Sequence, residues 1–142
     1  MKKWLAVTAC AVALPALLVA VQVARTPSVP GTVVYIQTPA DGATVTSPFT
    51  VRFGLKGMGV APAGVEVANT GHHHLLIDVE NLPDPGAALP ATDNIRHFGG
   101  GQTETDLTLP PGTHTLQLVF ADRLHIPHDP QVVSDKITIT VR

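Results

Sequence analysis

Apolar and polar residues alternate with a period of two along most of the chain. Successive side chains of a β-strand point to opposite faces, so this period predicts strands that each bury one face. About seven runs show it: residues 33–37, 49–56, 65–67, 72–80, 103–109, 113–122 and 136–142. No window has the period of a long amphipathic helix.

Turn-forming residues separate these runs, as in Asp41-Gly42 and in residues 83–86, 99–101 and 110–112. Short alternating strands with such spacing predict an all-β fold, an antiparallel immunoglobulin-like sandwich of two sheets and about seven strands. A small closed barrel is the alternative. The apolar faces predict one shared core: Phe53, Leu75, Ile77, Leu116, Leu118, Phe120, Ile137 and Ile139.

The N-terminus has the pattern of an export signal. Lys2 and Lys3 precede an uncharged apolar run from Trp4 to Val21, and small residues follow before Arg25. This order is typical of a secretory signal peptide, with an uncleaved membrane anchor as the alternative. We therefore expect a periplasmic or secreted protein. Its expected divisions are a signal at residues 1–24, a linker at residues 25–31 and a β-sandwich domain at residues 32–142.

Composition narrows the chemistry of the exported part. The single cysteine, Cys10, lies within the predicted signal, so a metal site would have to use nitrogen and oxygen ligands. From Arg25 onward there are seven Lys and Arg residues against eleven Asp and Glu residues, a net charge of −4. Nucleic acid is not an expected partner, because such binders carry a basic face.

All seven histidines lie between residues 72 and 128, and three are consecutive in GHHHLLIDVE. Alternation predicts that His73 points into the core with Leu75, whereas His72 and His74 share the other face. Two imidazoles at positions i and i+2 of a strand project side by side. Such a pair can chelate one metal ion.

Strand pairing predicts that further histidines join this pair. The turn at residues 110–112 is expected to make the runs 103–109 and 113–122 antiparallel neighbours, and the strand 72–80 is expected to run antiparallel to 113–122. The start of strand 72–80 would then lie near the segment before residue 103, which holds His97. It would also lie near the segment after residue 122, which holds His125 and His128. The expected ligands are His72, His74, His125 and His128, with His97 and Asp122 as a fifth ligand or as partners that orient an imidazole. His114 falls at the opposite end.

Neutral imidazole suits copper and zinc, so these are the expected metals. The alternative is a metal-free module whose histidines contact an envelope protein or a glycan, with Asp122 bonded to its own loop backbone. Signs of catalysis are missing from the sequence. There is no G-x-S-x-G elbow, no spaced pair of carboxylates and no phosphate-binding loop after a strand. We expect binding rather than catalysis.

Five blocks of sequence also resemble a known bacterial family. They are GVEVANTGHHHLLID, HFGGGQTE, LPPGTHTLQLVFAD, HIPH and VVSDKITITV. Together they are similar to the family called domain of unknown function 4399, over about residues 39–141. The resemblance implies an exported single-domain protein in which the histidine-containing blocks are characteristic. It implies no particular activity.

Overall fold

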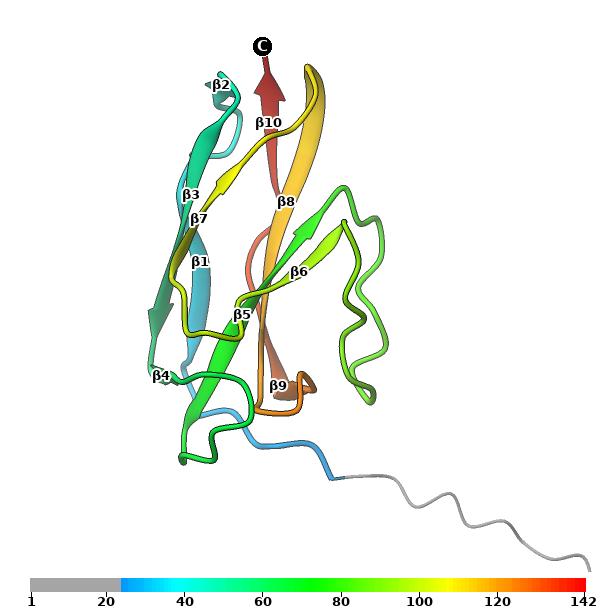
Figure 1. The fold of residues 1–142 in the computed structure, drawn as a ribbon. Coiled ribbons are helices and arrows are strands. Elements are labelled where there is room, and N and C mark those ends of the chain that lie inside the picture. Colours follow the sequence, from blue (N-terminus) through cyan, green and yellow to red (C-terminus); the bar gives the residue numbers. More distant parts are fainter. Residues whose placement is uncertain (1–23) are drawn as a thin grey trace, which may run out of the picture.

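The structure is a computed structural model that describes residues 24–142, and these residues form an all-β fold (Figure 1). Residues 1–23 of the predicted signal lie outside the described part, so the signal and the three divisions of the chain stay predictions. The strands are β1 (Val33–Thr38), β2 (Thr44–Val45), β3 (Phe49–Lys56), β4 (Gly59–Val60), β5 (Thr70–Ile77), β6 (Ile95–His97), β7 (Glu104–Leu107), β8 (Gly112–Ala121), β9 (Pro127–Val133) and β10 (Ile137–Val141).

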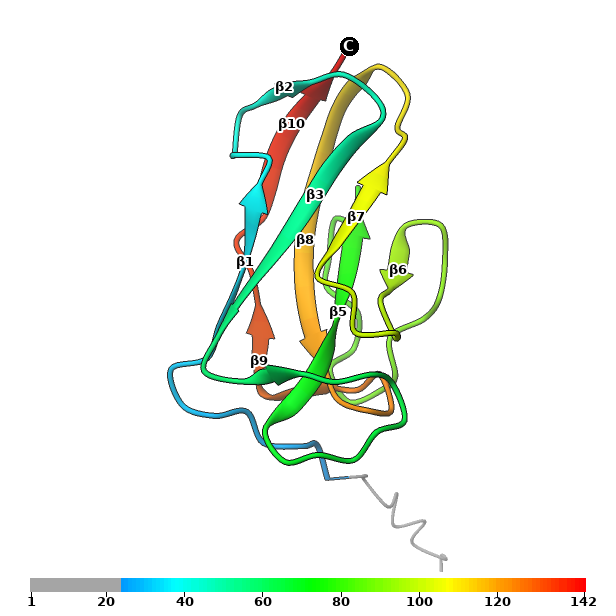
Figure 2. The same ribbon diagram turned by 60° about the vertical axis from the view of Figure 1, so that its left-hand side comes forward.

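The strands form two sheets that face each other (Figures 1 and 2). The smaller sheet has the order β1-β3-β7. The larger has the order β2-β10-β8-β5-β4, with β6 also paired to β5 and β9 also paired to β8. The prediction of an all-β protein with two sheets is therefore confirmed. Within residues 24–142, no helix is long and apolar enough to span a membrane.

One predicted strand is absent, and four observed strands, β2, β4, β6 and β9, were not predicted. Residues 65–67 form no strand, because this part of the chain is a loop that follows β4. The strand β9 was not predicted, since Pro127 and Pro130 interrupt any alternating pattern. Proline is tolerated at the edge of a sheet, and β8 is the one strand with which β9 pairs in the described residues.

The predicted pairing of the strands on either side of residues 110–112 was also wrong. β7 pairs with β3 in the smaller sheet, whereas β8 pairs with β10 and β5 in the larger one. The Pro-Pro-Gly turn thus carries the chain from one sheet to the other. Gly112 there has a φ of 135°, which other residues rarely adopt. The other predicted pair is correct, since β5 runs antiparallel to β8.

The main core lies between the two sheets. All eight residues predicted for it are buried in one cluster, and Leu118 is completely inaccessible. A second, smaller apolar cluster lies on the opposite face of the larger sheet. Its members are Leu76, Leu89, Ile95, Val119 and Ala121. This second cluster matters for function, because β5 presents two histidines to the same face.

Candidate metal centre

The strand β5 sends its three histidines to two different faces, as alternation predicted. His73 faces the main core, where its ring lies 5.1 Å from that of Phe53 and 5.2 Å from that of Phe120. His72 and His74 face the smaller cluster, and their ring centroids are 4.5 Å apart. All three side chains are fully buried.

A third imidazole reaches the pair from the loop between β8 and β9. His125 lies in this loop with a φ of 66°, an uncommon value for a residue other than glycine. Two backbone hydrogen bonds hold it: His125 N–H donates to the Asp122 carbonyl and Leu89 N–H donates to the His125 carbonyl, both at 2.9 Å. An uncommon backbone conformation held in this way is frequent at functional sites.

The three imidazoles converge on one point. His125 Nδ1 lies 2.9 Å from His72 Nε2 and 3.3 Å from His74 Nε2. One nitrogen from each ring lies within 4.8 Å of the other two. Ligand nitrogens at about 2.0–2.1 Å from one metal ion are separated by about 2.9 Å at a right angle and about 3.4 Å at a tetrahedral angle. The two separations from His125 Nδ1 match that range.

Hydrogen bonds among the three rings cannot give every one of the facing nitrogens a partner. A neutral imidazole has one N–H donor and one lone pair. His125 Nδ1 therefore forms one good hydrogen bond with either His72 or His74 and leaves the other Nε2 facing it without a partner. A cation at the centre would instead accept all three lone pairs. The arrangement of nitrogens could therefore hold a metal ion.

His97 stands beside the trio as a fourth imidazole. It lies directly opposite His74 in the pairing of β5 with β6, and its ring is 4.4 Å from that of His74 and 4.7 Å from that of His125. His97 Nε2 is 3.1 Å from the Pro90 carbonyl, to which it can only donate. That bond leaves the lone pair on Nδ1, the form in which His97 could act as a ligand.

Burial keeps the site neutral. It lowers the pKa of His72 to about 4, helped by His125 and His97 nearby. It lowers the pKa of His74 to about 2, helped by His72, His97 and His125. Burial also lowers the pKa of His125. At neutral pH these rings are uncharged, as metal ligands must be.

The structure does not bring His128 into this group. His128 is the second residue of β9, and its buried ring stacks on that of Phe120, with the ring centroids 5.7 Å apart. Its Nδ1 lies 3.3 Å from the Phe120 carbonyl, and its Nε2 has no partner within the described residues. His128 therefore supports the packing of the strand end.

Asp122 is bonded to its own loop instead of to an imidazole. Its Oδ1 accepts hydrogen bonds from the backbone N–H groups of Leu124 at 2.9 Å and Ile126 at 3.1 Å. Its Oδ2 accepts a hydrogen bond from the Thr26 hydroxyl at 2.7 Å. Burial alone would raise the pKa of Asp122, but these three hydrogen bonds lower it, so the carboxylate stays charged.

His114 lies at the far end of β8, as expected. Its Nδ1 lies 2.7 Å from Asp78 and its Nε2 lies 2.9 Å from the Pro110 carbonyl. The hydrogen bond to Asp78 raises the pKa of His114. With both nitrogens bonded, this histidine is structural.

Two residues near the site carried no signal in the sequence. Thr26 lies in the predicted linker, almost a hundred residues before the aspartate that it contacts. Ala121 lies directly opposite His72 in the pairing of β5 with β8. Both roles depend on pairing between distant segments, which a local pattern does not reveal.

Comparison with known proteins identifies the family. No curated protein and no solved structure matches the chain. Residues 51–142 match the family model described as Domain of unknown function (DUF4399), and this region contains all of β5 through β10 and every histidine. Because the match spans more than half of the 142 residues, the chain belongs to the DUF4399 family.

Proposed function

We propose that this protein binds one copper or zinc ion at His72, His74 and His125, with His97 as the fourth ligand. The observation that carries the proposal is the convergence of three ring nitrogens, with His125 Nδ1 at 2.9 and 3.3 Å from the other two. The function so proposed is metal binding or metal handling rather than catalysis.

The donor set supports these two metals. Three neutral imidazoles without thiolate or carboxylate suit copper and zinc, whereas magnesium and calcium prefer oxygen ligands. His72 and His74 are fully buried but His125 and His97 are partly exposed, so an ion would enter from the side of these two. Copper(II) generally binds more tightly than zinc to such a site.

We also propose that the protein works in the periplasm or outside the cell. The support is the basic and apolar pattern of the N-terminal residues. Mass measurement of the protein from the cell envelope tests this, with a mature chain expected to begin between about residues 21 and 25. An intact N-terminus held in the membrane would contradict cleavage.

The two sheets support an immunoglobulin-like plan as a further proposal. In such sandwiches the central strands of one sheet are antiparallel and the chain crosses repeatedly between the sheets. β5 and β8 form such a central pair, and the turn before β8 is one such crossing.

Calorimetric titration with zinc and copper(II) tests the metal site. The protein should be purified from the envelope without a histidine tag, stripped of metal and titrated at neutral pH. We expect saturable one-to-one binding of at least one ion and its loss in the double variant His72→Ala/His74→Ala. His114→Ala is the matched control, because His114 lies at the far end of β8 and should leave binding unchanged.

Two results would contradict the proposal. One is the lack of saturable heat with either ion, and the other is equal binding by the double variant and the wild type. Either result would favour the metal-free module that contacts an envelope protein or a glycan.

A further inference from the structure

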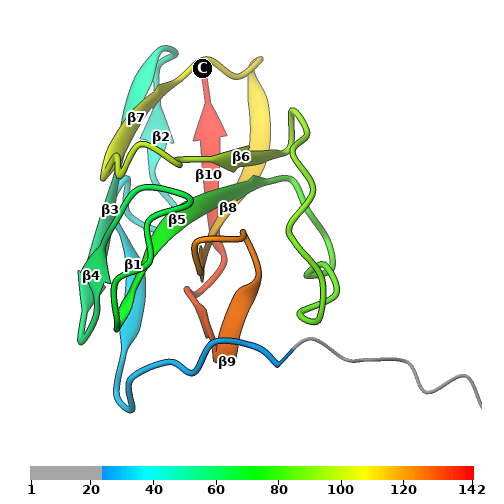
Figure 3. The same cartoon turned by 60° about the horizontal axis from the view of Figure 1, so that its bottom comes forward.

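The loop that carries His125 is held from outside by the N-terminal segment, residues 25–31. Figure 3 shows this segment running across the end of β9. Pro27 pairs with Asp129 as a parallel bridge. Ser28 N–H donates to the Asp129 carbonyl at 3.0 Å, and Asp129 N–H donates to the Thr26 carbonyl at 2.9 Å. We call residues 25–31 the strap.

Side chains of the strap add to these backbone bonds. Arg25 donates from Nε to the Pro127 carbonyl at 3.1 Å and from its terminal nitrogen to the His128 carbonyl. It also forms an ion pair with Asp129 at 3.5 Å. These contacts fix the strap to the first residues of β9, directly after the loop of His125.

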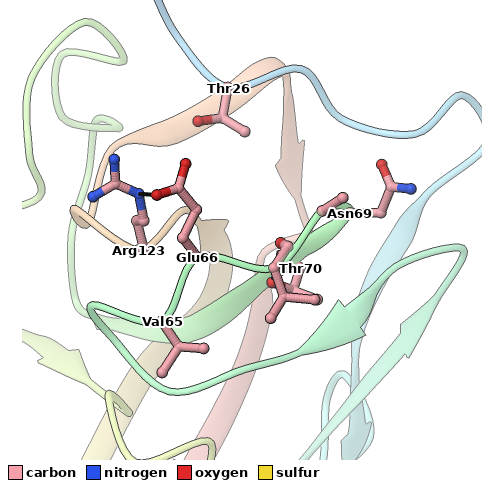
Figure 4. Close-up of a pocket in the computed structure, with 8 residues that line it drawn as sticks. Thr26, Val65, Glu66, Asn69, Thr70 and Arg123 are labelled. Carbon is pink, nitrogen blue, oxygen red and sulfur yellow. Dashed lines mark hydrogen bonds and ion pairs between the residues drawn. The ribbon is translucent and has the colours of Figure 1, made fainter.

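Thr26 connects the strap to the histidine loop itself. Its hydroxyl donates to Asp122 Oδ2, while Asp122 Oδ1 accepts the amides of Leu124 and Ile126 on either side of His125. The carboxylate therefore links the strap to both neighbours of the histidine. Thr26 and Arg123 both line a pocket of about 390 Å³. Figure 4 shows both side chains.

We propose that the strap controls the position of His125, through Thr26 and Asp122, and that release of the strap lowers the affinity of the site for its metal. The inference rests on the proposed function. Asp122 bonds the amides on either side of His125, whose φ is uncommon, and without His125 the proposed site keeps only His72, His74 and His97. Thr26 and Asp122 are thus positioning residues, and a force or partner that pulls the strap away from β9 releases the ion.

The variant Thr26→Val tests this, because it removes the hydroxyl and keeps the shape. We expect it to weaken copper(II) or zinc binding about tenfold, the loss typical of residues that orient metal ligands. The paramagnetic resonance spectrum of the copper form should also lose the coupling to one nitrogen. Thr26→Ser keeps the hydroxyl and should restore both. Ser28→Ala is the matched control, because Ser28 Oγ donates to the Pro130 carbonyl, away from the loop.

Hydrogen exchange in the metal-free protein tests the same inference without any ion. The amides of Leu124 and Ile126 should lose protection in Thr26→Val and keep it in Ser28→Ala. Unchanged protection, or equal metal affinity in wild type and Thr26→Val, would overturn the role of the strap. Failure of the wild type to bind metal would overturn the proposed function instead, and the exchange result would still decide whether the strap positions His125.

Discussion

His72 Nε2 lies 2.9 Å from His125 Nδ1, although 53 positions separate the two residues in the chain. One imidazole belongs to the central pair of the larger sheet, and the other to a loop at its end. Both are uncharged at neutral pH, because burial lowers both pKa values. The contact therefore joins a strand of the sheet to a loop through two nitrogens that could bind a metal.

The main core depends on Leu118, which is completely buried in β8. We expect Leu118→Ala to lower the free energy of unfolding by about 2–5 kcal/mol, because the lost methyl groups leave a cavity. Denaturant unfolding followed by circular dichroism measures it. Leu82→Ala is the matched control, since Leu82 is 42% exposed and should change stability little. Equal losses in the two variants would show that the core is assigned wrongly.

Gly71 lets β5 approach β8 and His128 closely. A Cβ atom at this position would overlap the Ala121 carbonyl oxygen and lie 2.8 Å from both His128 Cε1 and a ring carbon of Phe120. We expect Gly71→Ala to destabilise the protein by about 1–3 kcal/mol or more through overpacking.

Thermal unfolding of Gly71→Ala and Gly59→Ala side by side checks this prediction. A Cβ at Gly59 would lie at an ordinary 3.4 Å from the Thr70 side chain, so this control should behave almost as the wild type. A Gly71→Ala variant as stable as the control would mean that the strands can separate at no cost.

The sequence predicted the faces of the strands better than it predicted their partners. Alternation correctly put His73 in the core and His72 with His74 on the other face, because side-chain direction follows from the strand itself. It gave the wrong partner for β7, since a turn of three residues is compatible with a hairpin or with a crossing between sheets. Pairing depends on burial across the whole domain, which no local pattern contains.

The candidate site shows the same limit. His125 was expected near the pair and is there, but His128, only three residues later, is turned toward Phe120. The chain reverses in the loop at residues 122–126, which holds His125 and is bonded to Asp122, whereas His128 already lies in β9, where Pro127 pairs with Ala121. Spacing along the sequence could not distinguish the two histidines, because the reversal is set by side-chain hydrogen bonds and by the edge position of β9.

His73 fills space in the main core, but its buried polar ring should lower the free energy of unfolding relative to an apolar ring of similar shape. Neither of its ring nitrogens has a hydrogen-bond partner within the described residues, and an unpaired buried polar group costs about 1–3 kcal/mol. We expect His73→Phe to raise the free energy of unfolding by a similar amount, because the new ring packs against Phe53 and Phe120. Denaturant unfolding of the metal-free protein measures it.

The same variant should change the response to acid. Burial lowers the pKa of His73 from 6.5 to about 4, so the unfolded chain binds more protons than the folded one between these values. Stability is therefore lost as the pH falls from 6.5 toward 4, and His73→Phe should lose less of it. His114→Phe is the contrasting control, since it breaks the bond to Asp78 and should destabilise. Destabilisation by His73→Phe would indicate that the buried imidazole has a partner.

Metal binding should resist acid more than an exposed histidine site does. The folded pKa values of His72 and His74 are lowered to about 4 and about 2, so protons compete with the metal only well below the ordinary value of 6.5. We expect zinc affinity to fall less from pH 7 to about 5.5 than at an exposed site, because His72 and His74 are already neutral throughout this range. A peptide of residues 70–77 is the matched control: its exposed histidines should titrate near 6.5, and its affinity should fall over the same range. Calorimetry at several pH values compares them, and a parallel fall in the protein would mean that its ligands are exposed histidines rather than this buried cluster.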